Sequence, residues 1–249
     1  MDGLRYVAPA TVDEAVAALA GATGTAKLLS GGTDLLVQLR SGRVRPDLIV
    51  DTKRIPGLIG IKEEDGGFLI GAATSGAMLD EHAALSKAWP GVVEGMELIG
   101  STQVQGRASL VGNLCNASPA ADSVPALIAA RATCVIAGSK GQREAPVETI
   151  AVGPGKTSLA RDEMIIAFKL PKRPARSADA YLRFIPRTEM DIAVVGAAVN
   201  VTLDASGVCT DAMVVLGAVA PTAVIVPDAA KALIGSKLDD AALEKLDAA

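Results

Sequence analysis

The chain has 249 residues, of which 50% are hydrophobic, 21% charged and only 2% aromatic, with a formal net charge of −4. This length and apolar content fit a globular protein with a large core, and we expect one unit of about 170 residues followed by a smaller one. The acidic balance and the scarcity of aromatic rings exclude a nucleic-acid partner, which needs a basic face or stacking platforms.

Two segments bear on where the protein resides. Residues 1–9 lack the basic and apolar regions of a secretory signal, and the most apolar run, residues 212–227, is too short and too interrupted to span a membrane. The three cysteines, Cys115, Cys134 and Cys209, fit neither a disulfide framework nor a metal or iron–sulfur ligand set. We therefore expect a cytoplasmic protein with no membrane span and with reduced, mostly buried thiols.

The first predicted helix begins at a capping box, Thr11 to Glu14, and ends near Gly21. A short strand over residues 27–29 follows, and the pair Gly31-Gly32 then makes a turn into a helix capped by Thr33 or Asp34. A strand, a tight glycine turn and a helix start present consecutive backbone N–H groups to an anion such as a pyrophosphate.

The middle of the chain alternates regular patterns with one long exception. We expect a strand over residues 48–51, a hairpin over 60–71 and helices over 75–87 and 92–99. Periodicity then disappears from Gly100 to Asp122. Long irregular stretches inside a domain are usually functional or disordered, and this one is too apolar to be disordered.

A basic, proline-bearing segment, residues 171–177, is the expected boundary between two domains. The patterns around it predict a helix over 122–130, strands over 133–137 and 164–170, β-rich runs over 181–185, 192–203 and 208–219, and terminal helices near Leu233 and over 238–246.

Familiar catalytic signals are absent from the sequence. Gly155-Lys156-Thr157 lacks the first glycine of a phosphate-binding loop, and no dinucleotide-binding G-x-G-x-x-G follows a strand. His82 is the only histidine, which excludes a histidine-rich metal site and places it on a helix surface instead. An enzyme without a nucleophile or a metal usually depends on a cofactor. We expect no catalytic side chain and no metal site in this chain.

Three segments resemble a known family. Residues 29–35, LSGGTDL, and 108–122, ASLVGNLCNASPAAD, resemble the two flavin-binding motifs of the FAD-carrying medium subunit of molybdenum hydroxylases, and the likeness continues over 183–193. That family includes xanthine dehydrogenase, carbon monoxide dehydrogenase and bacterial N-heterocycle dehydrogenases. The resemblance implies an α+β fold, with an FAD-binding domain of the vanillyl-alcohol-oxidase (PCMH) type over residues 1–175. A C-terminal α/β domain like that of the carbon monoxide dehydrogenase flavoprotein is expected over residues 176–249.

The resemblance also implies which residues bind FAD. The first motif would wrap the pyrophosphate with Lys27, Leu28, Leu29, Ser30, Gly31, Gly32, Thr33, Asp34 and Leu35. The second would supply polar contacts from Ser109, Gly112, Asn113 and Asn116. Asp122 would accept hydrogen bonds from ribityl or ribose hydroxyls, and Arg183 would be a cationic contact. Apolar contacts are expected from Ile99, Ile165 and, near the isoalloxazine, Ile192.

Each of these residues also has a purely structural interpretation. The glycines could serve turns alone, Asp122 could cap a helix, and the two asparagines could satisfy loop backbone. The three isoleucines could equally belong to the core, and the cations of residues 172–176 to a solvated linker. Val111 departs from the usual glycine of the second motif, which leaves open a subunit that has lost its flavin.

The implied activity is electron transfer. A large molybdopterin-binding subunit would oxidise the substrate, a small subunit with two [2Fe-2S] clusters would pass electrons on, and FAD in this chain would deliver them to an external acceptor. NAD, a quinone, a cytochrome and oxygen remain open as acceptors. The alternative is a self-sufficient FAD-dependent oxidoreductase, against which the lack of an acid or base speaks. Because relatives usually continue beyond the position of Ala249, we expect the C-terminal domain to be incomplete or disordered there.

Overall fold

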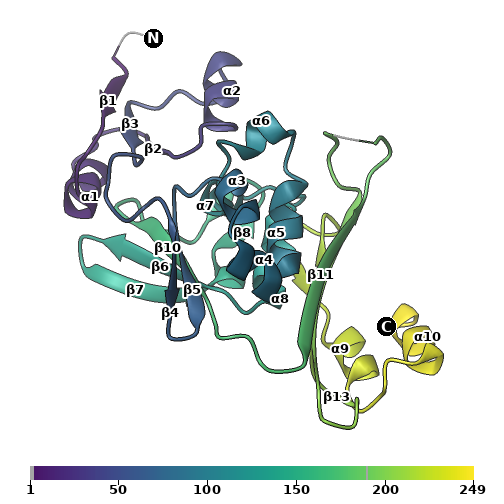
Figure 1. The fold of residues 1–249 in the computed structure, drawn as a ribbon. Coiled ribbons are helices and arrows are strands. Elements are labelled where there is room, and N and C mark those ends of the chain that lie inside the picture. Colours follow the sequence, from purple (N-terminus) through teal and green to yellow (C-terminus); the bar gives the residue numbers. More distant parts are fainter. Residues whose placement is uncertain (1–2, 189) are drawn as a thin grey trace.

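The computed structural model describes residues 3–188 and 190–249, and these form the expected α+β fold (Figure 1). The N-terminal lobe holds a parallel sheet in the order β1-β3-β2. Its elements are β1 (Arg5–Val7), α1 (Val12–Ala20), β2 (Ala26–Leu29), α2 (Leu35–Arg40) and β3 (Leu48–Asp51).

The capping box predicted at the start of α1 is confirmed. The Thr11 side chain accepts a hydrogen bond from the Glu14 N–H at 3.1 Å, and the Glu14 carboxylate accepts one from the Ala10 N–H at 2.7 Å. The helix buries Val16 and Leu19 against this lobe's core, which also includes Ala137 and Met164 from much later in the chain. The N-terminal lobe therefore cannot complete its core by itself.

The second lobe is built on an antiparallel five-stranded sheet in the order β4-β5-β10-β6-β7. The hairpin predicted over residues 60–71 and the strands predicted over 133–137 and 164–170 are confirmed. The strands are β4 (Ile61–Glu64), β5 (Gly67–Gly71), β6 (Thr133–Gly138), β7 (Gly141–Pro146) and β10 (Met164–Leu170), and the short elements η1 (Val147–Thr149), β8 (Ala151–Gly153) and β9 (Lys156–Thr157) lie between them.

The prediction of a single helix over residues 75–87 is wrong, because the helix is interrupted at His82. The chain forms α3 (Gly76–Asp80) and α4 (Ala83–Ala88), followed by α5 (Pro90–Glu97). The Nδ1 atom of His82 accepts a hydrogen bond from the Leu85 N–H at 3.2 Å, and the half-buried ring meets Phe68 edge to face. His82 is therefore a helix cap and not a residue on a helix surface.

The stretch from Gly100 to Asp122 is more regular than its sequence predicts. It contains α6 (Thr102–Gln105) and α7 (Leu110–Asn116), and α8 (Ser123–Ala129) follows at once. Helices of four and seven residues are shorter than the window of about 11–18 residues in which a helical period can be recognised, so the sequence pattern does not reveal them. The end of α7 is set by Ala117, which adopts a left-handed conformation with φ of 49°.

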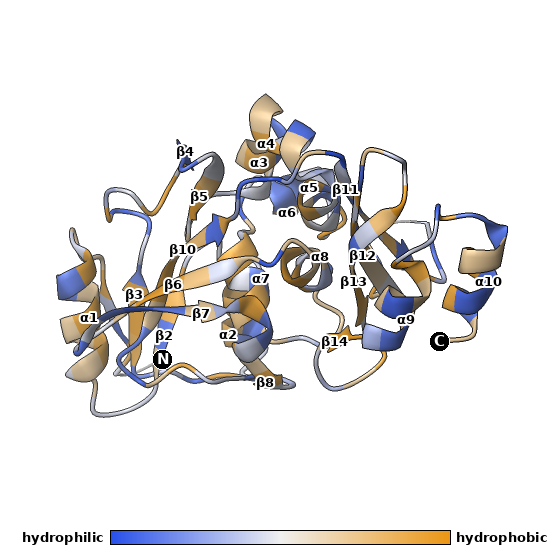
Figure 2. Ribbon diagram, turned by 90° about the horizontal axis from the view of Figure 1, so that it is seen from below, coloured by the Kyte–Doolittle hydropathy of each residue, from blue (hydrophilic) through white to orange (hydrophobic). Residues whose placement is uncertain are grey.

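The C-terminal part contains a four-stranded antiparallel sheet in the order β11-β12-β13-β14. Its elements are β11 (Ser177–Phe184), β12 (Val195–Leu203), β13 (Cys209–Gly217), β14 (Val224–Ile225), α9 (Pro227–Leu233) and α10 (Asp240–Asp247). One face packs on α5 and α8, and α9 packs on β13 (Figure 2). All three cysteines are free, and Cys134 and Cys209 are buried.

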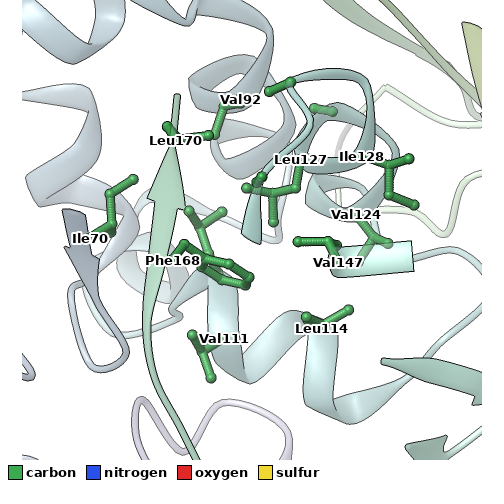
Figure 3. Packing of buried hydrophobic residues seen from close by; sticks show 14 of the residues in the cluster. Ile70, Val92, Val111, Leu114, Val124, Leu127, Ile128, Val147, Phe168 and Leu170 are labelled. Carbon is green, nitrogen blue, oxygen red and sulfur yellow. The ribbon is translucent and has the colours of Figure 1, made fainter. Parts of the chain in front are cut away.

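One core extends across both parts of the chain. Phe168 and Leu170 of β10 lie among aliphatic side chains of α5, α7 and α8, including Val92 and Leu127 (Figure 3). Tyr181, Ala198 and Val215 of the C-terminal sheet belong to the same cluster. The C-terminal sheet is thus packed closely on the second lobe.

The division at residues 175/176 remains our proposal, and the segment around it is less solvated than expected. Arg173 lies 4.5 Å from the centre of the Trp89 ring and pairs with the buried Asp179. Lys172 and Arg176 are exposed, as a linker would be. In the described part of the chain, no helix is both long enough and apolar enough to cross a membrane.

Replacing Phe168 tests the role of this core. Phe168→Ala should lower the free energy of unfolding by about 3–5 kcal/mol, because loss of the fully buried ring leaves a cavity among the core side chains of α7 and α8. Val152→Ala, at a side chain that is 59% exposed, should change it by less than about 0.5 kcal/mol. Urea denaturation of both variants measures the difference, and equal losses would contradict a single shared core.

Candidate functional site

A cavity of about 720 Å³ lies between the two lobes of the FAD-type domain. Its walls come from β2 and α2 of the N-terminal lobe and from α7, β9 and β10 of the second lobe. Fourteen of the eighteen expected cofactor contacts line it: Lys27, Leu28, Ser30, Gly31, Gly32, Thr33, Asp34, Leu35, Ile99, Ser109, Gly112, Asn113, Asn116 and Ile165. The two sequence motifs therefore meet at one cavity.

The glycine pair after β2 is required by space as well as by conformation. A Cβ atom on Gly31 would lie 2.0 Å from the carbonyl oxygen of Arg107, so the two backbones touch there. Gly32 has a φ of +82°, which non-glycine residues rarely adopt. The first motif is thus pressed directly against the start of the second.

The backbone of this loop offers free donors to the cavity. Among the described residues, the N–H groups of Gly31, Gly32, Thr33 and Asp34 donate to no protein acceptor, although all four residues line the cavity. Consecutive unpaired N–H groups beside a helix start favour a bound anion. These four residues are half-buried or exposed, so their donors are open to a ligand, and the loop fits a phosphate group.

Hydroxyl groups hold the two motifs together. Ser109 caps α7 by accepting a hydrogen bond from the Gly112 N–H at 3.1 Å. Its Oγ atom also lies 3.1 Å from the Oγ atom of Ser30, whose hydroxyl donates to the Ala72 carbonyl at 3.4 Å. Ser109 is only 2% exposed, so this contact is shielded from water.

Amide side chains extend the same link toward α2. Asn116 donates to the Asp34 carboxylate at 3.2 Å and accepts from the Gln38 amide at 3.0 Å. Asn113 accepts a hydrogen bond from Ser123 at 2.7 Å. Both asparagines thus bond to side chains, not to loop backbone. Although Asp34 is exposed as a residue, partial desolvation of its carboxyl group raises its pKa.

Four expected contacts lie outside the cavity lining: Leu29, Asp122, Arg183 and Ile192. Asp122 accepts hydrogen bonds from the Tyr181 hydroxyl at 2.9 Å and from Arg183 at 2.8 Å. The side chain makes no capping bond to α8, so its partners come from β11 instead. Ile192 is 75% exposed. Within residues 183–193, the structure describes every residue except Glu189.

Asp122, Tyr181 and Arg183 form a hydrogen-bonded group that is largely shielded from water. The side chains of Asp122 and Arg183 are only 10% and 7% exposed. Burial raises the pKa of Asp122, although the hydrogen bond from Tyr181 and the charge of Arg183 act in the opposite direction. Burial and the adjacent carboxylate raise the pKa of Tyr181 as well, so its hydroxyl stays protonated. The group joins the start of α8 to the C-terminal sheet.

Several lining residues were missed by the sequence analysis. They lie on both sides of the motifs and in the turn before β10: Thr23, Gly24, Thr25, Ala26, Gln38, Asp47, Thr52, Ala72, Cys115, Thr157, Leu159, Ala160, Arg161, Glu163 and Met164. Gly24 is a glycine for a structural reason, because a Cβ atom there would lie 1.9 Å from the Asp47 carboxylate. Its residue type is the one sequence feature that could have marked this wall. The others form no distinctive residue pattern in the sequence.

Val111 needs no rearrangement of the second motif. It lies within α7, lines the cavity and is 8% exposed as part of the main core cluster. A helical valine packed on the core leaves the Ser109 cap intact. The substitution of the usual glycine therefore gives no structural reason to expect a lost cofactor.

Ser109→Ala should lower the free energy of unfolding by about 1–2 kcal/mol, because it removes a buried helix cap and the partner of Ser30. Thr11→Ala removes the equivalent exposed cap of α1 and should cost less, about 0.5–1 kcal/mol. Urea denaturation measures both values. A smaller loss for Ser109→Ala than for Thr11→Ala would show that the hydroxyl contact does not couple the motifs.

Arg183→Met should destabilise the protein by about 3 kcal/mol at neutral pH, because it leaves the Asp122 carboxylate buried without its cation. The folded-state pKa of Asp122 is already raised and rises further without Arg183, so the folded state takes up a proton first as pH falls. The loss should therefore shrink between pH 7.5 and pH 5.5, as measured by urea denaturation. The pair Asp122→Asn with Arg183→Met carries no titrating group there and should show no such change.

Comparison with known proteins agrees with this geometry. The family model described as the FAD binding domain in molybdopterin dehydrogenase matches residues 2–173, and that of the CO dehydrogenase flavoprotein C-terminal domain matches residues 180–249. The putative xanthine dehydrogenase FAD-binding subunit of Escherichia coli K12 is 34% identical over 223 residues, or 89% of this chain and 76% of the relative.

Solved structures show the same fold. Carbon monoxide dehydrogenase from Hydrogenophaga pseudoflava superposes with a TM-score of 0.92 and 31% identity over 98% of this chain and 84% of its own chain. Quinoline 2-oxidoreductase from Pseudomonas putida superposes with a TM-score of 0.87 and 27% identity over 98% of this chain and 85% of its own chain. The chain therefore belongs to the FAD-binding oxidoreductase subunits of the molybdenum hydroxylases of the xanthine and carbon monoxide dehydrogenase type.

Proposed function

We propose that this chain binds one FAD in the cavity between its lobes and relays electrons through it from a partner subunit. The observation that carries the proposal is the run of four unpaired N–H groups from Gly31 to Asp34, which suits the FAD diphosphate. The carboxylate of Asp34 stands beside these donors and accepts a hydrogen bond from the Asn116 amide at 3.2 Å, and partial desolvation raises its pKa.

The cavity extends beyond the donor loop. Its wall includes Ala26, Lys27 and Leu28 of β2 and continues through Ser30 into the glycine loop. A strand rises about 3.3 Å per residue, so β2 adds roughly 10 Å of wall beside the loop. This wall suits the part of an extended FAD that lies on one side of its diphosphate.

The eighteen residues that the family resemblance assigns to FAD remain our proposed contact set. The fourteen that line the cavity are supported by position. Asp122 and Arg183 are paired with each other, so their proposed contacts with the cofactor require the ion pair to lie at its edge. Leu29 and Ile192 are the least supported members, because neither lines the cavity.

The proposed assembly is a heterotrimer. A large subunit with the molybdenum cofactor would oxidise the substrate, and a small subunit with two [2Fe-2S] clusters would pass the electrons to this chain. When bound, FAD would supply chemistry that connects the one-electron clusters to an external acceptor of either one or two electrons. The cytoplasmic location expected from the sequence stays a prediction, and the substrate would be selected by the large subunit.

The cavity offers little support for the rival self-sufficient oxidoreductase. Two of its carboxylates are engaged in structure: Asp47 accepts from the Thr25 N–H at 2.7 Å, and Glu163 pairs with Arg143 at 2.7 Å. Burial raises the pKa of the Cys115 thiol to about 12, so it is no base at neutral pH. An enzyme acting on its own substrate needs a poised acid or base, and none is present among these residues.

The relay is tested by mixing. The FAD-loaded chain is combined with the small subunit, whose clusters have been reduced beforehand, and flavin absorbance is followed. We expect bleaching of the flavin only when the small subunit is present. A flavin that stays oxidised beside reduced clusters would contradict the relay, and turnover of an organic substrate by the chain alone would favour the rival.

Gly31→Ala should weaken FAD binding at least about tenfold, or about 1.4 kcal/mol, because the added Cβ atom pushes the donor loop off the Arg107 carbonyl. Gly106→Ala is the matched control, since its nearest atom would be 3.6 Å away and its φ is −62°. Titration of the flavin-free variants with FAD, followed by flavin fluorescence, gives both affinities. Equal binding by the two variants would mean that this loop does not hold the cofactor.

A further inference from the structure

One end of the cavity is closed by a contact between the lobes that the flavin motifs do not include. Arg161 lies in the turn before β10, in the second lobe, and lines the cavity. Its guanidinium group donates to the carbonyl oxygens of Ala22 and of Gly24, the latter at 2.5 Å. Both acceptors belong to the loop between α1 and β2 of the N-terminal lobe.

The loop that receives Arg161 is held rigidly. The Thr25 N–H donates to the Asp47 carboxylate at 2.7 Å, and the Asp47 N–H donates back to the Thr25 carbonyl at 2.8 Å. Only glycine fits at position 24, because any Cβ atom would collide with that carboxylate. The two carbonyl groups are therefore presented in a fixed position.

The turn that carries Arg161 is braced from the other side. The Glu163 carboxylate accepts from the Ala160 N–H at 2.8 Å and forms a two-bond ion pair with Arg143 at 2.7 and 2.8 Å. The guanidinium thus joins two preorganised segments 137 and 139 residues apart in sequence. Both hydrogen bonds are donated by one nitrogen of the guanidinium, Nη2, which carries two hydrogens.

We propose that Arg161 is a positioning residue that retains FAD by closing this end of the cavity over one arm of the bound dinucleotide. The inference rests on the proposed function. β2 (Ala26–Leu29) separates the contact from the donor loop and spans roughly 10 Å, by the rise of about 3.3 Å per residue. The contact therefore acts on the part of the cofactor that the diphosphate loop does not reach. While the contact is made, that arm cannot leave between the lobes.

The release rate of FAD tests the proposal in the full chain. Wild type, Arg161→Met and Arg161→Lys are loaded with FAD and diluted rapidly, and flavin fluorescence follows the release. We expect Arg161→Met to release FAD roughly tenfold faster, because two charge-assisted hydrogen bonds are lost from an exposed site. Arg161→Lys should recover part of the retention, since its ammonium can reach one carbonyl.

Arg131→Met is the matched control. Arg131 is also exposed and also makes two side-chain hydrogen bonds across a long sequence separation, to Asp211, but it does not line the FAD cavity. It should release FAD at the wild-type rate. The unfolding temperature of the flavin-free chain is measured for each variant and should be similar for Arg161→Met and Arg131→Met.

The outcomes separate the two proposals. Release from Arg161→Met at the wild-type rate would overturn the role of Arg161 while leaving FAD binding intact. Faster release would also overturn it if the flavin-free form of Arg161→Met unfolded at a clearly lower temperature than that of Arg131→Met. The faster release would then reflect general instability. A wild-type chain that binds no FAD would overturn the proposed function itself. If Arg161→Met does not fold, Arg161→Gln removes the charge while keeping a polar side chain.

Discussion

The backbone contact between Gly31 and the Arg107 carbonyl is the constraint on which the site depends. Two loops from different lobes meet there with no side chain between them. Their approach brings Ser30 to Ser109 and Asp34 to Asn116, so the polar links between the motifs follow from it. In this arrangement the N–H groups of residues 31–34 donate to no acceptor among the described residues, and all four residues line the cavity. The packing of these two loops therefore produces a site that suits an anion.

The rest of the chain keeps this meeting point in place. The main core runs from β5 and β10 through α7 and α8 to the C-terminal sheet without interruption. Asp122, Tyr181 and Arg183 add a buried polar link where α8 meets β11. With very few aromatic residues, the chain fills this core mainly with leucine, isoleucine, valine and alanine. Such side chains pack well only if the backbone elements are close, which keeps the lobes in register.

Much of the fold could be predicted because its signals are local. The capping box of α1, the Glu64–Gly67 hairpin and the long strands β12 and β13 each show their period or turn residues within a few positions. The helices α6 and α7 could not be found this way, since each is shorter than the window that reveals a helical period. The break at His82 depends on a side-chain cap that no residue pattern announces.

The backbone segments of the site could be predicted from the sequence, whereas the side-chain partners of its residues could not. Glycines and small polar residues marked the loop and α7, because close approach and capping restrict residue type. The pairing of Asp122 with Tyr181 and Arg183 joins residues about 60 positions apart, which only the tertiary fold determines. The same holds for Arg161, whose acceptors are backbone carbonyls and carry no residue preference at all.

The composition of the N-terminal lobe's core has a consequence for how the protein is made. Its helix and parallel strands are complete by Asp51, yet their core includes Ala137 and Met164. The first fifty residues must therefore wait, with apolar surface exposed, until more than a hundred further residues have been synthesised. The cavity has no second wall before then. A ligand that needs both walls of the cavity can bind only after β10 has emerged from the ribosome.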